Sequence, residues 1–349
     1  MSEASSGKRV YEDAECSQAV IMVRTALITG ITGQDGSYLQ ELLLGKGYEV
    51  CGLVLKSDMA GVERLANKND LKLIEGDVRD QSSLEHAVKT SQPDEIYNLA
   101  APTFVASSFK DPILSSEVAG LGALRVMEAA RLKAPGAKVF QALTSEMFAG
   151  TSSSPQTEQT PFCPKSPYGI AKVFASMSSA CYRDNFGIFV GGGIFYNHES
   201  PRRPPEFVTR KISLGVARIA EGFQTTIELG NLDAKRDWGY APEYVDAAWR
   251  ILQQKSPEDF IIATGELHSV REFLEVACEV AGISDPMSRV KVDKRLIRQA
   301  DFGHLAGDAS KARKKLGWKP KTNFKELVRI MVEADLIVAE EEARKKHGR

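Results

Sequence analysis

The sequence of 349 residues is poor in the features that mark several classes of protein. It has five cysteines, an odd number, and none are spaced as metal ligands, which favours free thiols in a reducing cytoplasm. The five histidines show no ligand spacing either, so the sequence predicts no metal site. No apolar stretch approaches the roughly 20 residues of a membrane span, and the N-terminus lacks the apolar core of a secretory signal.

An excess of charge of one sign is also missing. The chain has 45 Lys and Arg against 46 Asp and Glu, and the basic residues are scattered, so no basic patch indicates nucleic acid. With 43% hydrophobic and 26% charged residues, the composition is that of a globular protein with one large or two smaller domains. We therefore expect a cytoplasmic protein that binds neither nucleic acid nor membrane.

Short apolar runs alternate with helical patterns from Arg24 onward. The runs that predict strands are residues 25–29, 49–54, 71–76, 95–100, 138–143 and 188–195. The patterns that predict helices between them are residues 37–47, 83–90, 114–132 and 168–187. Because parallel strands need crossover connections, this alternation predicts an α/β fold, a Rossmann-type doubly wound parallel sheet with helices on both faces.

The pattern changes after Phe195, where a proline- and arginine-rich loop begins. A helix over 207–222, a short strand and two amphipathic helices over 269–282 and 324–346 follow. They predict a smaller, mixed α/β C-terminal lobe that binds substrate. The expected divisions are a flexible tail, 1–22; a dinucleotide-binding domain, 23–195 plus part of 236–264; and the substrate lobe, 196–235 and 265–345.

A glycine-rich turn separates the first predicted strand from its helix. In "TGITGQDGSYLQELL", Gly30, Gly33 and Gly36 let the backbone approach a pyrophosphate, while the helix N-terminus offers unpaired N–H groups. The alternative is an ordinary tight turn, but the position between strand and helix favours a dinucleotide site. The predicted cofactor contacts of this turn are Gly30, Thr32, Gly33, Gln34, Asp35 and Gly36.

The choice of cofactor is made at the end of the second strand, "LVLKSD". An acidic residue there holds the ribose hydroxyls of NAD, whereas a basic one accommodates the phosphate of NADP. Lys56 and Ser57 favour NADP, although Lys56 could be a plain surface lysine and the nearby Asp58 keeps NAD as the less favoured alternative. The ends of the third and fourth strands complete the predicted cofactor site with Asp77, Val78, Leu99, Ala100 and Ala101.

Tyr168 and Lys172 lie four residues apart in "SPYGIAKVFA", which places them on one face of a helix. An ammonium near a phenol favours the phenolate, so we expect Lys172 to lower the pKa of Tyr168. Such a tyrosine can take a proton from an alcohol while hydride leaves for a nicotinamide, and both residues would contact the cofactor. Thr144, at the end of a strand, would hydrogen-bond the same substrate hydroxyl.

This arrangement resembles the extended short-chain dehydrogenase/reductase family from Thr25 to about Asp335. Longer stretches are similar to the GDP-mannose 4,6-dehydratases, namely "ALITGITGQDGSYLQELL", "QALTSEMF", "TPFCPKSPYGIAK", "FYNHESPRR", "FVTRKI", "LGNLDAKRDWG", "EDFIIATGELHSVREF" and "KARKKLGWKP". The resemblance implies an NADP-dependent hydro-lyase that converts a GDP-linked manno-sugar to its 4-keto-6-deoxy product. It also implies a homodimer or homotetramer, with the helix over 114–132 at the interface.

The resemblance gives Glu146 of "LTSEMF" a role. A dehydratase oxidises carbon 4, eliminates water across carbons 5 and 6, and returns hydride to carbon 6. The elimination needs an acid–base, which the resemblance assigns to Glu146, two residues past Thr144. Ser145 stands where some related dehydratases carry a separate aspartic acid, so Glu146 would serve both steps. The alternative is that Glu146 only caps the next turn.

The nucleotide half of such a substrate carries two phosphates that need donors. The residues expected to bind the substrate are Ser145, Asn197, Lys211, Arg236, Arg298 and Asp301. Arginine suits phosphate because its planar fork bonds two oxygens at once. Asp301 stands where the family has a glutamate that can hold a ribose hydroxyl. The alternative for each charged residue is an ordinary surface charge.

Departures from the family pattern leave the sugar open. Pro102, Thr103 and Phe104 stand where many relatives show Gln-Ser-His, and Cys163 replaces an aromatic residue. The substrate could be GDP-mannose or its homologue GDP-manno-heptose. Two other functions stay open: another NAD(P)-dependent sugar-nucleotide epimerase or reductase, which would not need Glu146, and a non-catalytic NADP sensor, which would not need the Tyr/Lys pair.

Overall fold

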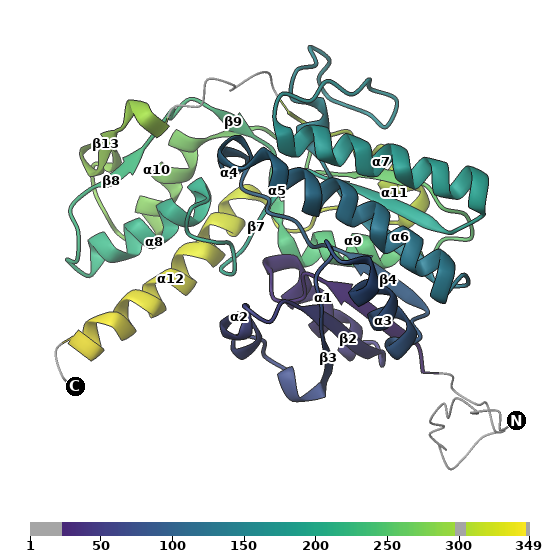
Figure 1. Cartoon of the computed structure of the whole chain (residues 1–349). Coiled ribbons are helices and arrows are strands. Elements are labelled where there is room, and N and C mark those ends of the chain that lie inside the picture. Colours follow the sequence, from purple (N-terminus) through teal and green to yellow (C-terminus); the bar gives the residue numbers. More distant parts are fainter. Residues whose placement is uncertain (1–22, 297–304, 347–349) are drawn as a thin grey trace, which may run out of the picture.

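The computed structural model describes residues 23–296 and 305–346 (Figure 1). The predicted tail over residues 1–22 and two predicted substrate contacts, Arg298 and Asp301, lie outside these residues. Within the described ranges, no helix combines the length and apolar character needed to cross a membrane.

A seven-stranded parallel sheet forms the centre of the molecule. Its strands lie in the order β11-β6-β5-β4-β1-β2-β3, which confirms the predicted doubly wound fold. Their bounds are β1 (Thr25–Thr29), β2 (Glu49–Val54), β3 (Leu71–Glu75), β4 (Glu95–Asn98), β5 (Lys138–Thr144), β6 (Val190–Phe195) and β11 (Asp259–Ile262). The direction of winding reverses between β1 and β4, and ligands of such sheets bind at that point, beyond the carboxyl ends of the strands. The strand β11, which has four residues, was not among the predicted strands.

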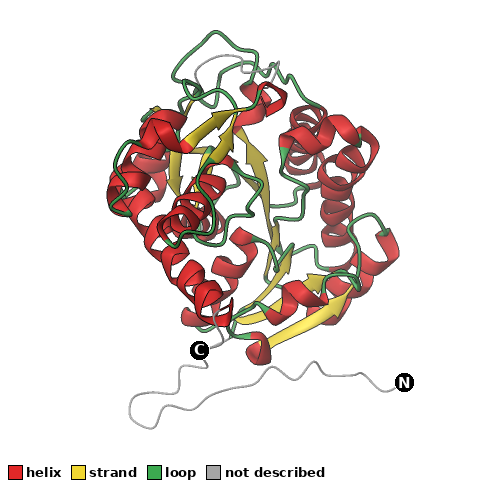
Figure 2. Cartoon of the chain, turned by 90° about the vertical axis from the view of Figure 1, so that its left-hand side faces the viewer, coloured by secondary structure: helices red, strands yellow, loops and turns green. Residues whose placement is uncertain are grey.

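Helices cover both faces of this sheet (Figure 2). One face packs against α3 (Gln81–Ser91), α6 (Gly122–Lys133) and α7 (Pro167–Phe186), and the other against α1 (Gln34–Gly45), α9 (Ala241–Leu252) and α11 (Ser310–Leu316). The alternation of strand side chains sets this division, since Leu27 belongs to the first core and Ile28 to the second. Both faces are therefore buried, as in other all-parallel sheets.

The helix predicted over 114–132 is interrupted. It consists of α5 (Pro112–Ser116), a π-helical turn (Glu117–Leu121) and α6, so the single regular helix was wrong. Short helices are also present as α2 (Met59–Glu63) and α4 (Val105–Lys110), and as the 3₁₀ turns η1 (Lys68–Asp70), η3 (Ser145–Phe148), η4 (Pro286–Arg289) and η5 (Lys294–Leu296).

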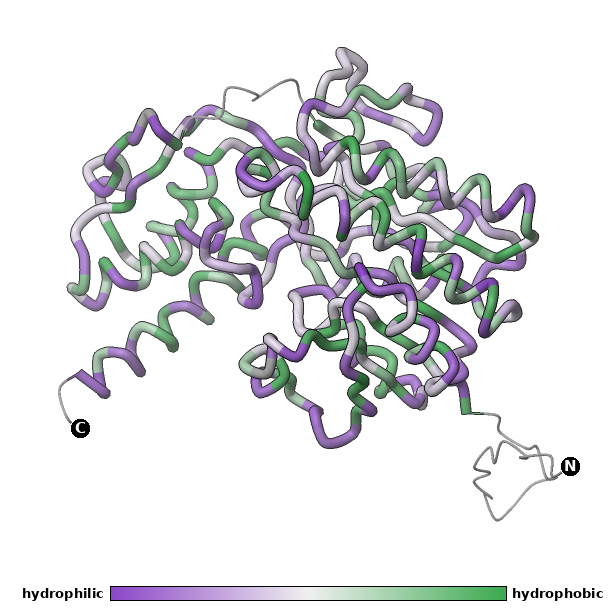
Figure 3. Tube along the Cα trace, in the orientation of Figure 1, coloured by the Kyte–Doolittle hydropathy of each residue, from purple (hydrophilic) through white to green (hydrophobic). Residues whose placement is uncertain are grey.

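The C-terminal elements build a separate core, on the left in Figure 1. They are α8 (Val208–Ala220), α10 (Val270–Val280) and α12 (Phe324–Lys346), with the strand pairs β7 (Asn197–Glu199) and β10 (Trp238–Tyr240), β9 (Lys235–Arg236) and β12 (His268–Ser269), and β8 (Ile227–Leu229) and β13 (Val290–Val292). Hydrophobic and hydrophilic residues alternate along α12 (Figure 3), as expected of a helix with one buried side. We call this group of elements the small lobe.

Candidate active site

The glycine turn packs directly against the end of β4. Gly30 has a φ of +72°, and a Cβ there would lie 2.9 Å from the backbone nitrogen of Ala100. A Cβ on Gly36 would lie 2.2 Å from the Gly30 carbonyl oxygen. Gly33 precedes α1 as its N-cap, so the first N–H groups of the helix face this turn. Such a cradle, closed to any side chain and lined by N–H groups, fits the pyrophosphate of a dinucleotide.

The two polar side chains of the turn, Gln34 and Asp35, reach across to the segment that enters the small lobe. Gln34 Nε2 donates to the His198 carbonyl at 3.1 Å, and Ser200 Oγ donates to Gln34 Oε1 at 2.8 Å. Asp35 Oδ2 lies 2.9 Å from Nε2 of His198, whose Nδ1 lies 2.8 Å from the Tyr196 carbonyl. The side chains of the turn therefore hold β7 in place.

His198 and Asp35 form a charged pair. Both ring nitrogens of His198 face oxygen acceptors, so both must carry a proton to be satisfied. Burial opposes the charge on His198, but the carboxylate of Asp35 outweighs it and the pKa of His198 is raised. Burial likewise opposes the charge on Asp35, and His198 reverses that effect, so the pKa of Asp35 is lowered. His198 was not among the predicted site residues.

The four predicted catalytic residues come together at the end of β5. Ser166 caps α7 by accepting a hydrogen bond from the Gly169 N–H at 3.1 Å, which starts the helix just before Tyr168. A Cβ on Gly169 would lie 2.8 Å from the Glu146 carbonyl oxygen, so α7 rests directly on η3. Thr144 follows at the end of β5, where its hydroxyl hydrogen-bonds with Tyr168.

Burial dominates the protonation of the catalytic pair. Tyr168 is 5% exposed, and burial together with the charge of Glu146 raises its pKa, against the smaller lowering by Thr144 and Arg203. The expected lowering by Lys172 was wrong, because the Lys172 ammonium donates to the Ala142 carbonyl at 2.8 Å and lies 5.8 Å from the phenol ring centre. Burial lowers the pKa of Lys172 itself to about 8.

Arg203 is a cation of the site that the sequence analysis did not predict. Its guanidinium lies 3.7 Å from the ring centre of Phe207, and its Nε lies 3.1 Å from Glu199 Oε2. Glu199 is 1% exposed and also accepts a hydrogen bond from Thr209 at 2.5 Å. The charge of Arg203 reaches Tyr168, whose pKa it lowers. The signal available in the sequence was the acid and base four residues apart in "ESPRR", directly after a strand.

The other predicted cofactor contacts lie along the same carboxyl edge of the sheet. Lys56 and Ser57 are exposed after β2, whereas Asp58 accepts hydrogen bonds from Thr32 at 2.5 Å and from the Gly61 N–H at 3.2 Å. After β3, Asp77 pairs with Arg79 and Val78 is buried, and after β4 Leu99, Ala100 and Ala101 run past Gly30.

The predicted substrate contacts are spread more widely. Ser145 is buried in η3, and Asn197 begins β7 beside His198. Lys211 lies on α8 and Arg236 on β9, where its Nη1 donates to the Lys235 carbonyl at 2.7 Å. The described residues contain no group of three or more His, Cys, Asp and Glu that could hold a metal.

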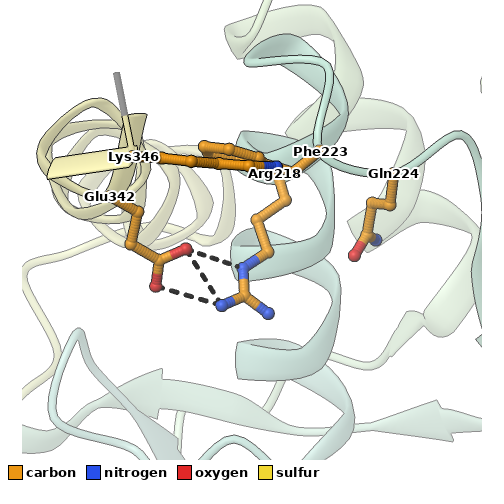
Figure 4. A pocket seen from close by; sticks show the side chains of 5 residues that line it. All are labelled: Arg218, Phe223, Gln224, Glu342 and Lys346. Atoms are coloured by element: carbon orange, nitrogen blue, oxygen red, sulfur yellow. Dashed lines mark hydrogen bonds and ion pairs between the residues drawn. The ribbon is translucent and has the colours of Figure 1, made fainter. Parts of the chain in front are cut away.

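A surface pocket lies elsewhere, between the ends of α8 and α12 (Figure 4). Two nitrogens of Arg218 bond with Glu342 at 3.0 to 3.2 Å, and Lys346 covers the ring of Phe223 at 5.4 Å. The pocket shares no lining residue with the catalytic group, and its two cations are already engaged. It is therefore a packing feature of the two helix ends.

The doubly wound sheet, the glycine cradle and the Tyr168–Lys172 pair together define an extended short-chain dehydrogenase/reductase. The solved structures of dTDP-glucose 4,6-dehydratase DesIV from Streptomyces venezuelae, with NAD bound, and of RMD from Pseudomonas aeruginosa, complexed with NADPH, share the fold. Their TM-scores are 0.79 and 0.78 at 23% and 20% identity, covering 92% and 90% of this chain and 98% and 100% of theirs.

Within that class, residues 27–331 match the family model for GDP-mannose 4,6 dehydratase. GDP-mannose 4,6 dehydratase 1 of Arabidopsis thaliana is 47% identical over 332 residues, covering 91% of each chain. The human GDP-mannose 4,6 dehydratase is 44% identical over 342 residues, covering 89% of this chain and 91% of its own. This chain belongs to the GDP-mannose 4,6-dehydratase family.

Proposed function

We propose that this protein is an NADP-dependent 4,6-dehydratase of a GDP-linked manno-sugar. The observation that carries the proposal is the carboxylate of Glu146 beside a complete Thr144, Tyr168 and Lys172 set, close enough to raise the pKa of Tyr168. An epimerase or reductase would not need this carboxylate, and a sensor would not need the Tyr/Lys pair. The names of the relatives support GDP-mannose as the substrate class.

In the first half of the reaction, Tyr168 takes the proton of the hydroxyl on carbon 4. Thr144 orients that hydroxyl and the phenol together, the positive charge of Arg203 stabilises the phenolate as it forms, and Lys172 would hold the cofactor beside them. A bound nicotinamide cofactor would accept the hydride from carbon 4 and return it to carbon 6.

In the second half, Glu146 acts on the other side of the ring. The ketone at carbon 4 acidifies the proton on carbon 5, and Glu146 removes it and passes a proton to the hydroxyl that leaves carbon 6. Thr144 and Glu146 are held together because the Glu146 N–H donates to the Thr144 hydroxyl at 3.3 Å. Ser145 cannot serve as an acid, so one carboxylate carries both proton transfers.

NADP is the proposed cofactor rather than NAD. Lys56 and Ser57 are exposed at the end of β2, where a 2′-phosphate would lie. Asp58 is the acid that could favour NAD, but its carboxylate is engaged by Thr32 and by the Gly61 N–H. A purified protein that retains NAD and shows no preference for NADP would refute this choice.

The small lobe is proposed to hold the GDP portion, as predicted for residues 196–235 and 265–345, although the lobe also includes Arg236 and the strand β10. Asn197, Lys211, Arg236 and Arg298 would bind the two phosphates, and Asp301 a ribose hydroxyl. Support comes from the two described cations, Lys211 and Arg236, which project from small-lobe elements and are only partly buried.

GDP-mannose is the leading sugar, with GDP-manno-heptose as the rival. Phe104, at the start of α4, meets Phe207 edge to face at 5.4 Å, which brings the large domain against the small lobe next to Arg203. Cys163 is only half buried, and a thiol in place of a ring leaves volume for a seventh carbon. The ratio of kcat/KM for the two substrates decides between them.

A homodimer or homotetramer in the cytoplasm is the proposed assembly. Ile170, Phe174 and Met177 follow one face of α7 and are 58%, 42% and 60% exposed. The elements α5 and the π-helical turn pack against α7 and expose Ile113 and Leu121 at 73% and 37%. A contiguous apolar surface of this kind marks an interface between chains. Light scattering should give at least twice the mass of one chain, and Met177→Lys should lower it.

The test of the function is incubation of the protein with GDP-mannose and with GDP-manno-heptose. The expected product has lost one water, and in deuterated water it carries deuterium on carbon 5. No NADPH absorbance should accumulate, because hydride is returned in every turnover. Steady accumulation would identify a dehydrogenase instead, and epimerisation without loss of mass would identify an epimerase.

A further inference from the structure

A row of buried polar side chains crosses the centre of the sheet beneath the catalytic residues. Thr29, Asn98 and Gln141 are register partners on β1, β4 and β5, and they are 0%, 3% and 1% exposed. The centre of a parallel sheet is ordinarily aliphatic, since a buried polar group costs free energy unless it is hydrogen-bonded. Three such groups side by side indicate a purpose beyond packing.

The hydrogen bonds of the row run in one direction. The Ala100 N–H donates to the Thr29 hydroxyl at 3.3 Å, and that hydroxyl donates to Asn98 Oδ1 at 2.7 Å. Asn98 Nδ2 donates to Gln141 Oε1 at 2.8 Å. Gln141 Nε2 then donates to the Ala142 carbonyl at 2.9 Å. Turning either amide over would set like groups against each other, so the row has a single satisfied arrangement.

The row ends on the acceptor of the catalytic lysine. Lys172 Nζ donates to the same Ala142 carbonyl at 2.8 Å, from a side chain that is 3% exposed. Gln141 and Lys172 therefore share one oxygen, and the amide that orients this carbonyl also sets where the ammonium rests. The other end of the row, Ala100, packs against Gly30 of the cofactor turn.

We propose that Gln141 is a positioning residue for Lys172, held in its orientation by Asn98 and Thr29. It acts through the Ala142 carbonyl and contacts neither Tyr168 nor Thr144 by any hydrogen bond described. Its effect on turnover rests on the proposed dehydratase function, whereas its effect on the titration of Lys172 does not.

The charged and titratable groups around the lysine are known from the structure. Asp35 from α1, which is paired with His198, acts on the charge of Lys172 directly. Tyr168 lies on α7 itself, and its pKa is shifted by Glu146 from η3 and by Arg203 from the small lobe. A substitution at Gln141 changes none of them. A change in the titration of Lys172 in a Gln141 variant therefore shows that the hydrogen-bonded row acts on Lys172.

The first test is Gln141→Glu, which places a carboxyl group beside the Ala142 carbonyl. A nearby negative charge favours the ammonium, so Lys172 should titrate at a pH higher by roughly one unit. The measurement is the rate at which a small anhydride acylates Lys172 in cofactor-free protein, followed by mass spectrometry across pH. An unchanged titration would overturn the proposal.

The second test is Gln141→Met, which keeps the length of the side chain and removes its donor. Misplacing a catalytic group by about 1 Å can cost roughly 100-fold, so we expect kcat to fall about 10- to 100-fold while KM for the GDP-sugar stays within about threefold. The matched control is Tyr97→Phe, next to Asn98 on β4. Tyr97 is fully buried on the opposite face, where its hydroxyl donates to Glu95 at 2.6 Å.

The two variants separate positioning from stability. Tyr97→Phe should lower the melting temperature and leave kcat unchanged. If Gln141→Met keeps kcat within twofold of the wild type, or if Tyr97→Phe loses as much turnover, the positioning role is refuted. If the wild type converts no GDP-sugar, the proposed function fails, and the Lys172 titration in Gln141→Glu still decides the role of Gln141. The same titration decides it if Gln141→Met does not fold.

Discussion

The two halves of the site are built in different ways. On the large domain, Thr144, Tyr168 and Lys172 are 9%, 5% and 3% exposed, and they are fixed by the end of a central strand and the first turns of a 20-residue helix. On the small lobe, Lys211 and Arg236 are partly exposed, and Arg236 lies on a strand of only two residues.

This difference follows from what each half must do. Groups that take part in bond breaking gain from being held rigid and shielded from water, because their charges then act without reorganisation. Groups that bind a nucleotide need only place a positive charge near its phosphates, and a flexible exposed side chain can do so. Catalytic residues should therefore control kcat, and small-lobe residues should control KM.

The largest effect is expected at Glu146. Glu146→Gln keeps the shape of the side chain and removes the base, so turnover should fall about 100- to 10,000-fold while substrate and cofactor still bind. Because oxidation at carbon 4 precedes the loss of the carbon 5 proton, enzyme-bound NADPH absorbance should appear on mixing and persist. Stopped-flow absorbance measures it.

The companion variant is Tyr168→Phe, which should block the first hydride transfer as well, so no absorbance at the nicotinamide band should develop. This contrast assigns the two residues to different halves of the reaction. Dehydration by Glu146→Gln at close to the wild-type rate would reduce the carboxylate to a structural role.

The second effect concerns the glycine cradle. Gly36→Ala would force a Cβ to within 2.2 Å of the Gly30 carbonyl, and overpacking of this kind typically costs about 1–3 kcal/mol, so cofactor affinity should fall about 10- to 100-fold. Gly45→Ala on the same helix is the control, since nothing lies within 4 Å of its added Cβ. Calorimetric titration with NADP should distinguish the two, and equal affinities would refute the cradle.

Much of the large domain could be predicted because its signals are local. The six predicted strands were confirmed. The glycine turn and the Tyr168–Lys172 spacing could be recognised because each lies within a short stretch of sequence. The four-residue β11 was missed because the small-lobe elements from β7 to β10 separate it from β6 and break the alternation of strands and helices. The π-helical turn before α6 could not be foreseen either, since its apolar spacing is nearly that of a regular helix.

The pair formed by His198 and Asp35 could not be predicted from spacing. Asp35 and His198 are 163 residues apart in the sequence, and only the fold of the whole chain brings Asp35 Oδ2 to 2.9 Å from His198 Nε2. The same holds for the error in the pKa of Tyr168: the Lys172 spacing was right, but its ammonium turns to the Ala142 carbonyl, and burial prevails.

The third effect tests the small lobe. Arg236→Ala should raise KM about 10- to 100-fold, with a smaller change in kcat, because the phosphates it would bind do not react. Lys235→Ala is the matched control, since Lys235 is the exposed neighbour on β9. Steady-state kinetics with the GDP-sugar measures both. An unchanged KM in Arg236→Ala would remove the phosphate assignment, and a large loss of kcat would erase the contrast between the two halves.

The smallest effect concerns the Asp35–His198 pair, which joins the halves. The pKa of His198 is raised, so its contribution to stability is complete below its unfolded value of about 6.5 and is lost as pH rises through the folded value. The pKa of Asp35 is lowered, so its contribution is complete above about 3.9 and is lost as pH falls through the folded value. The pair should therefore stabilise the protein most between about pH 4 and 6.5.

His198→Gln tests this window. Its melting temperature should lie roughly 2–4 °C below that of the wild type near pH 5.5, a difference that corresponds to about 1 kcal/mol, and the gap should narrow as pH rises past the folded pKa of His198, because the wild type then loses the same charge pair. His86→Gln is the control, since His86 is an exposed histidine on α3 and its replacement should leave the curve unchanged. Differential scanning calorimetry from pH 4 to 9 gives both curves. A gap of constant size across this range would mean that His198 stabilises the protein by packing on Tyr244, with ring centres 4.7 Å apart, and that the carboxylate of Asp35 contributes nothing to the connection between the cofactor turn and the small lobe.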